Sequence, residues 1–123
     1  MASQSPLVLI VDDDESLGQM LAWDLEELGY RVNTVSNVHE ALAQLGSRRP
    51  DLVLLDYRLP DGSGLDILEV LAKQNRPPPA IIISGESEAG LDARCRDRGA
   101  REFLRKPVKS TMLDRLIRTL RPV

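Results

Sequence analysis

Residues 52–56 read Leu-Val-Leu-Leu-Asp, four apolar residues followed at once by a carboxylate. A short run that is apolar throughout is typical of a strand buried on both faces, as in a parallel sheet. Similar runs occupy residues 7–11 and 80–83. Segments with the spacing of amphipathic helices lie between the runs. This alternation predicts repeated βα units around one parallel sheet.

The remaining elements complete a set of five such units. Alternating or apolar patterns predict two further strands at 30–35 and 101–104. Helices are predicted at about 15–28, from 38 to a stop at Gly46, at 65–73, at 87–98 and through 112–120. We therefore expect an α/β fold with a doubly wound, five-stranded parallel sheet.

Length and composition narrow the class of protein. The chain has 123 residues, which suggests one domain, and a net charge of -3, which argues against non-specific binding to nucleic acid. Its apolar runs are too short to span a membrane, and residues 1–5 lack the pattern of a signal peptide. The single cysteine, Cys95, excludes an internal disulfide and a cysteine metal cluster. We expect a cytoplasmic protein.

Polar side chains follow the predicted strands at the points where they end. Asp12 and Asp13 follow the first run, Asp56 closes the third strand and Ser84 closes the fourth. Lys106 follows the fifth strand. Because ligands bind at the carboxyl ends of strands in doubly wound sheets, these groups should meet at one edge. A carboxylate cluster facing a lysine and a hydroxyl predicts a site for a divalent cation and a phosphoryl group.

The chemistry of this cluster follows from its charges. Three crowded carboxylates repel one another, so without a cation at least one pKa should rise. Oxygen ligands at this density suit Mg²⁺. With the cation bound, Asp56 could ionise and act as a nucleophile, since aspartates form acyl phosphates. Lys106 could neutralise a phosphoryl group, and Ser84 could donate a hydrogen bond to it.

Five short motifs carry a resemblance to a known family: residues 11–15 (Val-Asp-Asp-Asp-Glu), 51–56 (Asp-Leu-Val-Leu-Leu-Asp), 59–64 (Leu-Pro-Asp-Gly-Ser-Gly), 83–85 (Ile-Ser-Gly) and 103–107 (Phe-Leu-Arg-Lys-Pro). Each motif alone is weak, but together, in this order and each after its strand, they are specific. Over essentially its whole length the chain resembles a response regulator receiver domain of two-component signalling, of the CheY-like type. The resemblance implies a flavodoxin-like (βα)5 fold with strand order 2-1-3-4-5.

The resemblance also assigns the acidic residues. It implies that Asp56 accepts a phosphoryl group from the phosphohistidine of a sensor histidine kinase or a histidine phosphotransfer domain. Asp13 would bind Mg²⁺ directly, and Asp12 through water. Asp56 and the backbone carbonyl of Arg58 would complete the protein ligands.

The other motif residues would register the phosphoryl group. The resemblance implies that Ser84 and Lys106 hold its oxygens and that the Lys106–Pro107 bond is cis. Phe103 matches the switch aromatic of the family. It would rotate as Ser84 moves inward, and this would remodel the face formed by the fourth helix, fifth strand and fifth helix.

Such a domain is a switch that promotes only its own phosphorylation and dephosphorylation, and is not an enzyme with a free substrate. We expect a monomer or weak dimer without direct nucleic-acid or membrane contact, acting on an unnamed output protein or fused effector. It could stand alone or form one domain of a longer regulator or hybrid sensor kinase.

Alternatives remain open at this point. Asp12 and Asp14 also fit the Asp-x-Asp of haloacid-dehalogenase-like phosphatases, with Asp12 as nucleophile, although Asp56 would then have no role. A receiver-like domain used only for protein interaction is a third option.

Two further predictions concern single residues. Arg58 and Glu86 each lie two residues past a site residue, and we expect them to pair across the entrance of the site. Trp23 lies off the apolar stripe of its helix and is either a partly exposed aromatic or a docking anchor.

Overall fold

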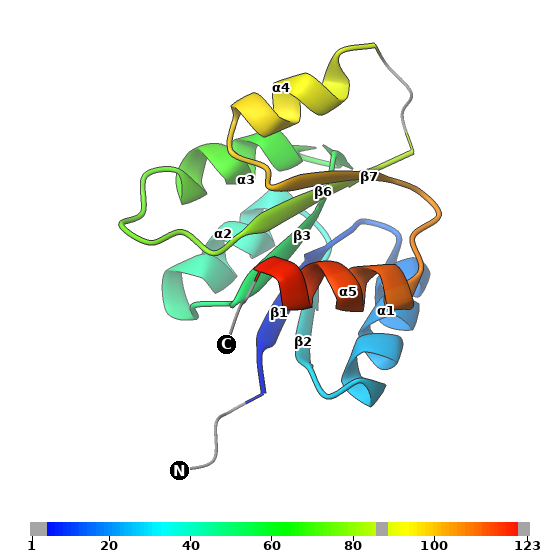
Figure 1. The fold of residues 1–123 in the computed structure, drawn as a ribbon. Coiled ribbons are helices and arrows are strands. Elements are labelled where there is room, and N and C mark those ends of the chain that lie inside the picture. Colours follow the sequence, from blue (N-terminus) through cyan, green and yellow to red (C-terminus); the bar gives the residue numbers. More distant parts are fainter. Residues whose placement is uncertain (1–4, 86–88, 121–123) are drawn as a thin grey trace.

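The computed structural model describes residues 5–85 and 89–120. The strands of its main sheet are β1 (Leu7–Val11), β2 (Arg31–Val35), β3 (Leu52–Asp56), β6 (Ala80–Ser84) and β7 (Glu102–Arg105). They are all parallel and lie in the order β2-β1-β3-β6-β7 (Figure 1). Since β6 and β7 are the fourth and fifth strands of this sheet, the expected order 2-1-3-4-5 is confirmed.

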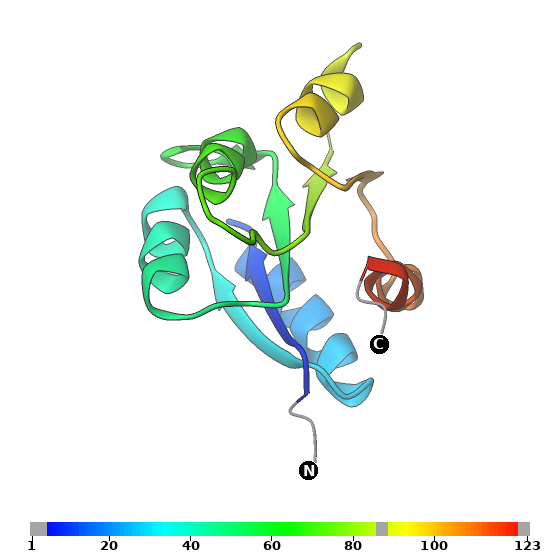
Figure 2. The same ribbon diagram turned by 60° about the vertical axis from the view of Figure 1, so that its left-hand side comes forward.

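Helices cover both faces of the sheet. They are α1 (Glu15–Glu27), α2 (Val38–Ser47), α3 (Gly64–Leu71), α4 (Leu91–Asp97) and α5 (Ser110–Leu120). Helices α1 and α5 lie on one face, and α2, α3 and α4 lie on the other (Figures 1 and 2). The arrangement is the doubly wound α/β sheet that the alternating pattern predicts.

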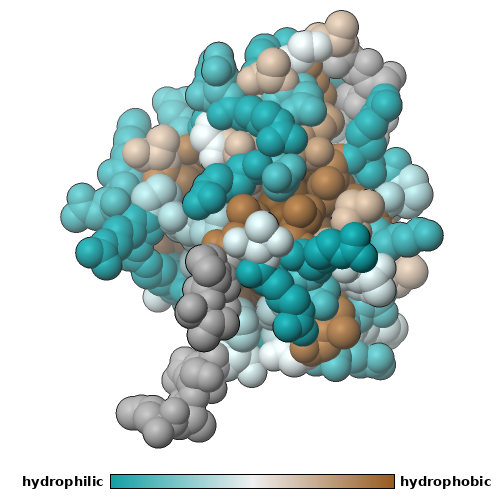
Figure 3. Space-filling model, viewed as in Figure 1, coloured by the Kyte–Doolittle hydropathy of each residue, from teal (hydrophilic) through white to brown (hydrophobic). Residues whose placement is uncertain are grey.

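Strand β3 shows why its run has to be apolar throughout. All five of its residues are buried. Val53 and Leu55 pack into the core beneath α2, α3 and α4, whereas Leu52 and Leu54 pack into the core beneath α1 and α5. Because successive side chains of a strand point to opposite faces, a strand covered on both sides needs apolar residues at every position. The outer surface is different: in Figure 3 hydrophilic side chains dominate the visible face.

Several element boundaries differ from the sequence prediction. Helix α4 begins at Leu91 instead of residue 87, because Gly90 before it has a left-handed φ of 82°. Ser87 lies outside the described residues. Helix α2 continues through Gly46 to Ser47, so this glycine does not end the helix. A short antiparallel hairpin, β4 (Arg58–Leu59) with β5 (Gly62–Ser63), occupies part of the predicted loop.

Two glycines offer a matched test of packing near the strand ends. A Cβ atom on Gly64 would lie 2.9 Å from the backbone oxygen of Asp56 and 2.9 Å from Cδ1 of Ile82. We expect Gly64→Ala to lower the free energy of unfolding by about 1–3 kcal/mol through overpacking. Gly46→Ala meets no atom within 4 Å inside α2 and should raise the free energy of unfolding by about 0.5–1 kcal/mol. Urea denaturation of both variants measures this, and equal shifts would contradict the packing argument.

Candidate functional site

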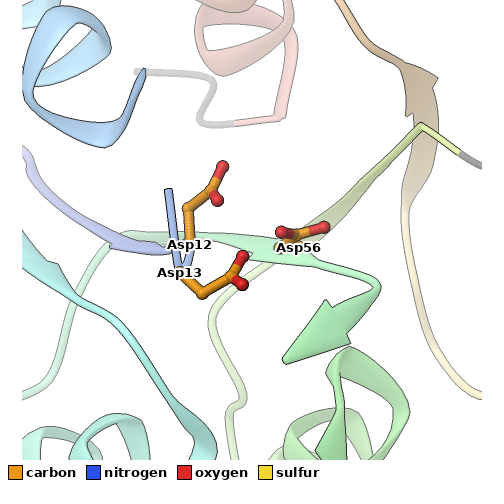
Figure 4. Close-up of side chains that lie close together, drawn as sticks. All are labelled: Asp12, Asp13 and Asp56. Carbon is orange, nitrogen blue, oxygen red and sulfur yellow. The ribbon is translucent and has the colours of Figure 1, made fainter. Parts of the chain in front are cut away.

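The carboxyl ends of β1 and β3 bring three aspartates together. One carboxylate oxygen from each of Asp12, Asp13 and Asp56 lies within 4.8 Å of the others. Figure 4 shows Asp12 and Asp13 side by side after β1, with Asp56 across from them at the end of β3. Asp12 and Asp56 are each 7% exposed, whereas Asp13 is exposed to solvent. The predicted acidic cluster therefore forms, with two buried members and one open one.

Lys106 supplies a cation to this cluster. Its Nζ lies 3.3 Å from Oδ2 of Asp56 and 3.5 Å from Oδ2 of Asp12, so one ammonium bridges both buried carboxylates. The backbone N–H of Lys106 donates to the carbonyl of Ser84 at 2.9 Å, which anchors the lysine to the end of β6. The Lys106–Pro107 peptide bond is cis.

The electrostatics of the cluster act most strongly on Asp56. Burial, followed by repulsion from Asp12, raises the pKa of Asp56 to about 7, and the attraction of Lys106 only partly opposes this rise. Burial also lowers the pKa of the Lys106 ammonium, but attraction to Asp56 and Asp12 outweighs it, so the net pKa of the lysine is raised. The pKa of Asp56 is thus raised, as expected for one carboxylate of the cluster, with burial as the larger cause and repulsion from Asp12 as the second. One lysine does not balance the buried negative charge.

This donor set fits Mg²⁺. It offers only oxygen atoms, from few carboxylates, and one of those carboxylates is open to water, which matches the preference of Mg²⁺ for mixed carboxylate and water ligands. The backbone carbonyl of Arg58 is a further candidate ligand, since Arg58 begins β4 two residues beyond Asp56. Its side chain is exposed and places the guanidinium carbon 6.0 Å from the centre of the Tyr57 ring.

The remaining predicted residues lie on neighbouring strands. Ser84 ends β6 and is only 1% exposed. Gly85 beside it leaves open space, since an added Cβ would meet no atom within 4 Å. Phe103 lies on β7 opposite Ile82 and is half-buried. The expected pairing of Arg58 with Glu86 cannot be described, because Glu86 lies outside the described residues.

Two acidic residues near the cluster have other partners. The Asp14 side chain caps α1 by accepting the Leu17 N–H at 3.1 Å, so it is a helix cap instead of a ligand. The Asp61 carboxylate accepts backbone N–H bonds from the first turn of α2. Sequence reasoning missed this second contact. The Asp-Gly dipeptide indicated a turn there, but nothing local indicates a partner 23 residues away.

Comparison with known proteins gives the family. The model of the response regulator receiver domain matches residues 8–118. The nitrogen assimilation regulatory protein NtrX of Azorhizobium caulinodans is 34% identical over 121 residues, which cover 93% of this chain and 26% of that protein. The KDP operon transcriptional regulatory protein KdpE of Escherichia coli is 36% identical over 100 residues, covering 81% of this chain and 44% of that protein. The chain belongs to the response regulator receiver domain family.

Solved structures agree with this assignment. The receiver domain of the Francisella response regulator 1452 superimposes with a TM-score of 0.87 at 28% identity, covering 94% of this chain and 96% of that one. The receiver domain of a signal transduction histidine kinase from Syntrophus aciditrophicus gives a TM-score of 0.85 at 30% identity, covering 94% and 89%. The chain spans less than half the length of the two curated relatives above.

The family bears on the phosphatase alternative. Receivers are regulators of two-component systems and not a classical enzyme family, and a phosphatase with Asp12 as nucleophile is not favoured. That alternative would also leave the buried Asp56 without a role. Within the described residues, each helix is too short or too polar to cross a bilayer. Trp23 is 62% exposed on α1, as expected for an aromatic off the apolar stripe.

Proposed function

We propose that this chain is the phosphoryl-accepting switch of a two-component pathway, and that Asp56 is its acceptor. The observation that carries the proposal is the buried Asp56 carboxylate beside Asp12 and Asp13, held 3.3 Å from the Lys106 ammonium. This arrangement combines a nucleophile, oxygen ligands for a cation and a fixed positive charge. Phosphoryl transfer depends chiefly on such positioning and charge stabilisation.

The transfer itself is a displacement at phosphorus. A carboxylate oxygen of Asp56 forms the new O–P bond as the N–P bond of a phosphohistidine breaks. The imidazole nitrogen keeps the bonding electron pair and takes up a proton. Asp13, Asp12 through water, Asp56 and the Arg58 carbonyl would hold Mg²⁺, which when bound neutralises charge on the phosphoryl oxygens.

The remaining roles concern the phosphorylated state. Lys106 and the Ser84 hydroxyl would each bind a phosphoryl oxygen. Movement of Ser84 toward the phosphoryl group would let Phe103 rotate, which would change the face formed by α4, β7 and α5. Attack by water on the acyl phosphate would return the carboxylate and release inorganic phosphate, so the chain promotes only its own phosphorylation and dephosphorylation.

The donor would be a sensor histidine kinase or a histidine phosphotransfer domain in the cytoplasm. Residues 1–123 would form one receiver unit, either alone or within a longer regulator or hybrid kinase. It would act as a monomer or weak dimer on a fused effector or separate output protein, without touching nucleic acid or membrane itself.

Incubation with acetyl phosphate tests this function without knowledge of the kinase. We expect the intact protein to gain the mass of one phosphoryl group when Mg²⁺ is present, and the added group to be lost at alkaline pH, as acyl phosphates are. Chelation of Mg²⁺ with EDTA should prevent the gain. Labelling that is stable to alkali, or equally fast with EDTA, would contradict the proposal.

A further inference from the structure

The hairpin that follows Asp56 is hydrogen-bonded to helix α2 through the carboxylate of Asp61. Its strands pair Arg58 with Ser63 and Leu59 with Gly62, which leaves Pro60 and Asp61 at the tip. Oδ1 of Asp61 accepts the backbone N–H of Val38 at 2.8 Å. Oδ2 of the same carboxylate accepts the N–H of His39 at 3.0 Å. Both oxygens of Asp61 are therefore used to hold the tip against the first turn of α2.

These bonds complete the capping of α2. The N-cap side chain of Asn37 accepts the N–H of Glu40 at 2.8 Å. The two amides before Glu40 are satisfied by Asp61 from a distant part of the chain. Free N–H groups and the helix dipole both favour a carboxylate at this position. In keeping with this, the bonds from Val38 and His39 hold the pKa of Asp61 below its usual value.

The other side of the hairpin is equally confined. The Asp66 side chain accepts the Ser63 N–H at 3.0 Å in the capping box of α3. A Cβ atom on Gly62 would collide with the Asp66 carboxylate and come within 3.3 Å of Cγ2 of Val38. At the base of the hairpin, the Gly64 N–H donates to the Tyr57 carbonyl at 2.9 Å. The hairpin is thus wedged between α2 and α3, and Asp61 makes its hydrogen bonds to α2.

We propose that Asp61 is a positioning residue for the metal site. By fastening the hairpin tip to α2, its carboxylate holds the backbone of Arg58 in the place from which the Arg58 carbonyl binds Mg²⁺. This inference rests on the proposed function, in which that carbonyl is a ligand. Mg²⁺ requires a nearly ideal octahedral arrangement, so a ligand on a loosened hairpin would bind it less well. Asp61 itself touches neither the cation nor the phosphoryl group.

Calorimetric titration with Mg²⁺ tests this inference in variants of Asp61 and Asn37, whose side chains both cap the first turn of α2. Asp61→Ala removes the bonds to Val38 and His39, and we expect it to weaken Mg²⁺ binding by about ten-fold, as loss of residues that support metal ligands does. Asn37→Ala is the matched control: it removes the bond to Glu40 but leaves the hairpin attached. We expect it to change Mg²⁺ affinity by less than about two-fold, although it weakens the same helix end.

A second variant and a metal-free measurement complete the experiment. Asp61→Asn keeps one side-chain acceptor and should lie between wild type and Asp61→Ala in Mg²⁺ affinity. Amide hydrogen exchange without metal should accelerate at residues 58–63 in Asp61→Ala and not in Asn37→Ala. If the wild type binds Mg²⁺ and Asp61→Ala binds it equally well, only the inferred role of Asp61 is overturned. The same follows if the two alanine variants lose Mg²⁺ affinity equally. If the wild type fails to bind Mg²⁺, the proposed function is overturned as well.

Discussion

Asp56→Asn should stabilise the metal-free protein at about pH 8 by roughly 1–3 kcal/mol, while abolishing phosphoryl acceptance. The stabilisation arises because the ionised Asp56 is buried next to Asp12 and only partly neutralised by Lys106. An amide of the same shape carries no charge and removes this repulsion. The loss of acceptance follows because the amide is not a nucleophile for the phosphoryl group.

The pH dependence of this effect has a defined sign. The pKa of Asp56 is about 7 in the folded protein, against an ordinary pKa of 3.8 for an aspartate carboxyl. Between these values the folded state binds more protons than the unfolded state, so the stability contribution of this group falls as the pH rises. The penalty is absent below about pH 4 and complete above about pH 7, at most about 1.4 kcal/mol for each unit of pKa difference, and the attraction of Lys106 is already included in that difference.

Urea denaturation in EDTA measures the effect. Wild type and Asp56→Asn should be equally stable near about pH 4 and should diverge as the pH approaches about 8, with the variant more stable. Asp24→Asn on α1 is the control, since Asp24 is exposed to solvent. The difference in stability between Asp24→Asn and wild type should not grow as the pH rises. An Asp56→Asn variant that is less stable than wild type at high pH would show that the cluster is not under electrostatic strain.

Lys106→Met should slow Mg²⁺-dependent phosphorylation by acetyl phosphate at least about 100-fold, the range expected when a charge-stabilising donor is removed. The methionine keeps a long apolar stem but lacks the ammonium that lies 3.3 Å from Asp56. Without Mg²⁺ the variant should also lose about 1–4 kcal/mol of stability, because Asp12 and Asp56 would remain buried without a cation.

Lys109→Met separates this effect from a general loss of positive charge. Lys109 lies three residues further on and is exposed, so its loss should leave the rate of phosphorylation within about two-fold of wild type. Measuring the labelling rate by intact mass over time compares the two variants directly. Equal rates for Lys106→Met and wild type would remove the lysine from the site.

The sequence predicts those features of the fold and site that depend on the type of residue at a given place along a strand. Residues 52–55 are apolar at every position because β3 is buried on both faces, and this predicted the sheet. Asp56 and Lys106 stand at strand ends, and parallel strands bring their ends to one edge. The cluster was therefore predictable from position alone, without knowledge of any distance.

The features that were missed depend on contacts between distant residues. The attachment of Asp61 to α2 needs a partner 23 positions away, which no local pattern indicates. The short hairpin at Arg58 lies in a stretch whose sequence indicates only a turn-rich loop. The polar stretch before α4 has a helical composition and predicts an earlier start, but the left-handed conformation of Gly90 sets the start at Leu91. Likewise, the sequence indicated that Lys106 faces the carboxylates, but not that it bridges Asp12 as well as Asp56.

The most direct test of the central proposal is the position of the phosphoryl group after labelling. Protein phosphorylated by acetyl phosphate can be reduced with borohydride, which converts the modified aspartate to homoserine, and the peptides can then be sequenced by mass spectrometry. We expect homoserine at position 56 and nowhere else. Homoserine at position 12, which a phosphatase with Asp12 as nucleophile would give, would contradict it.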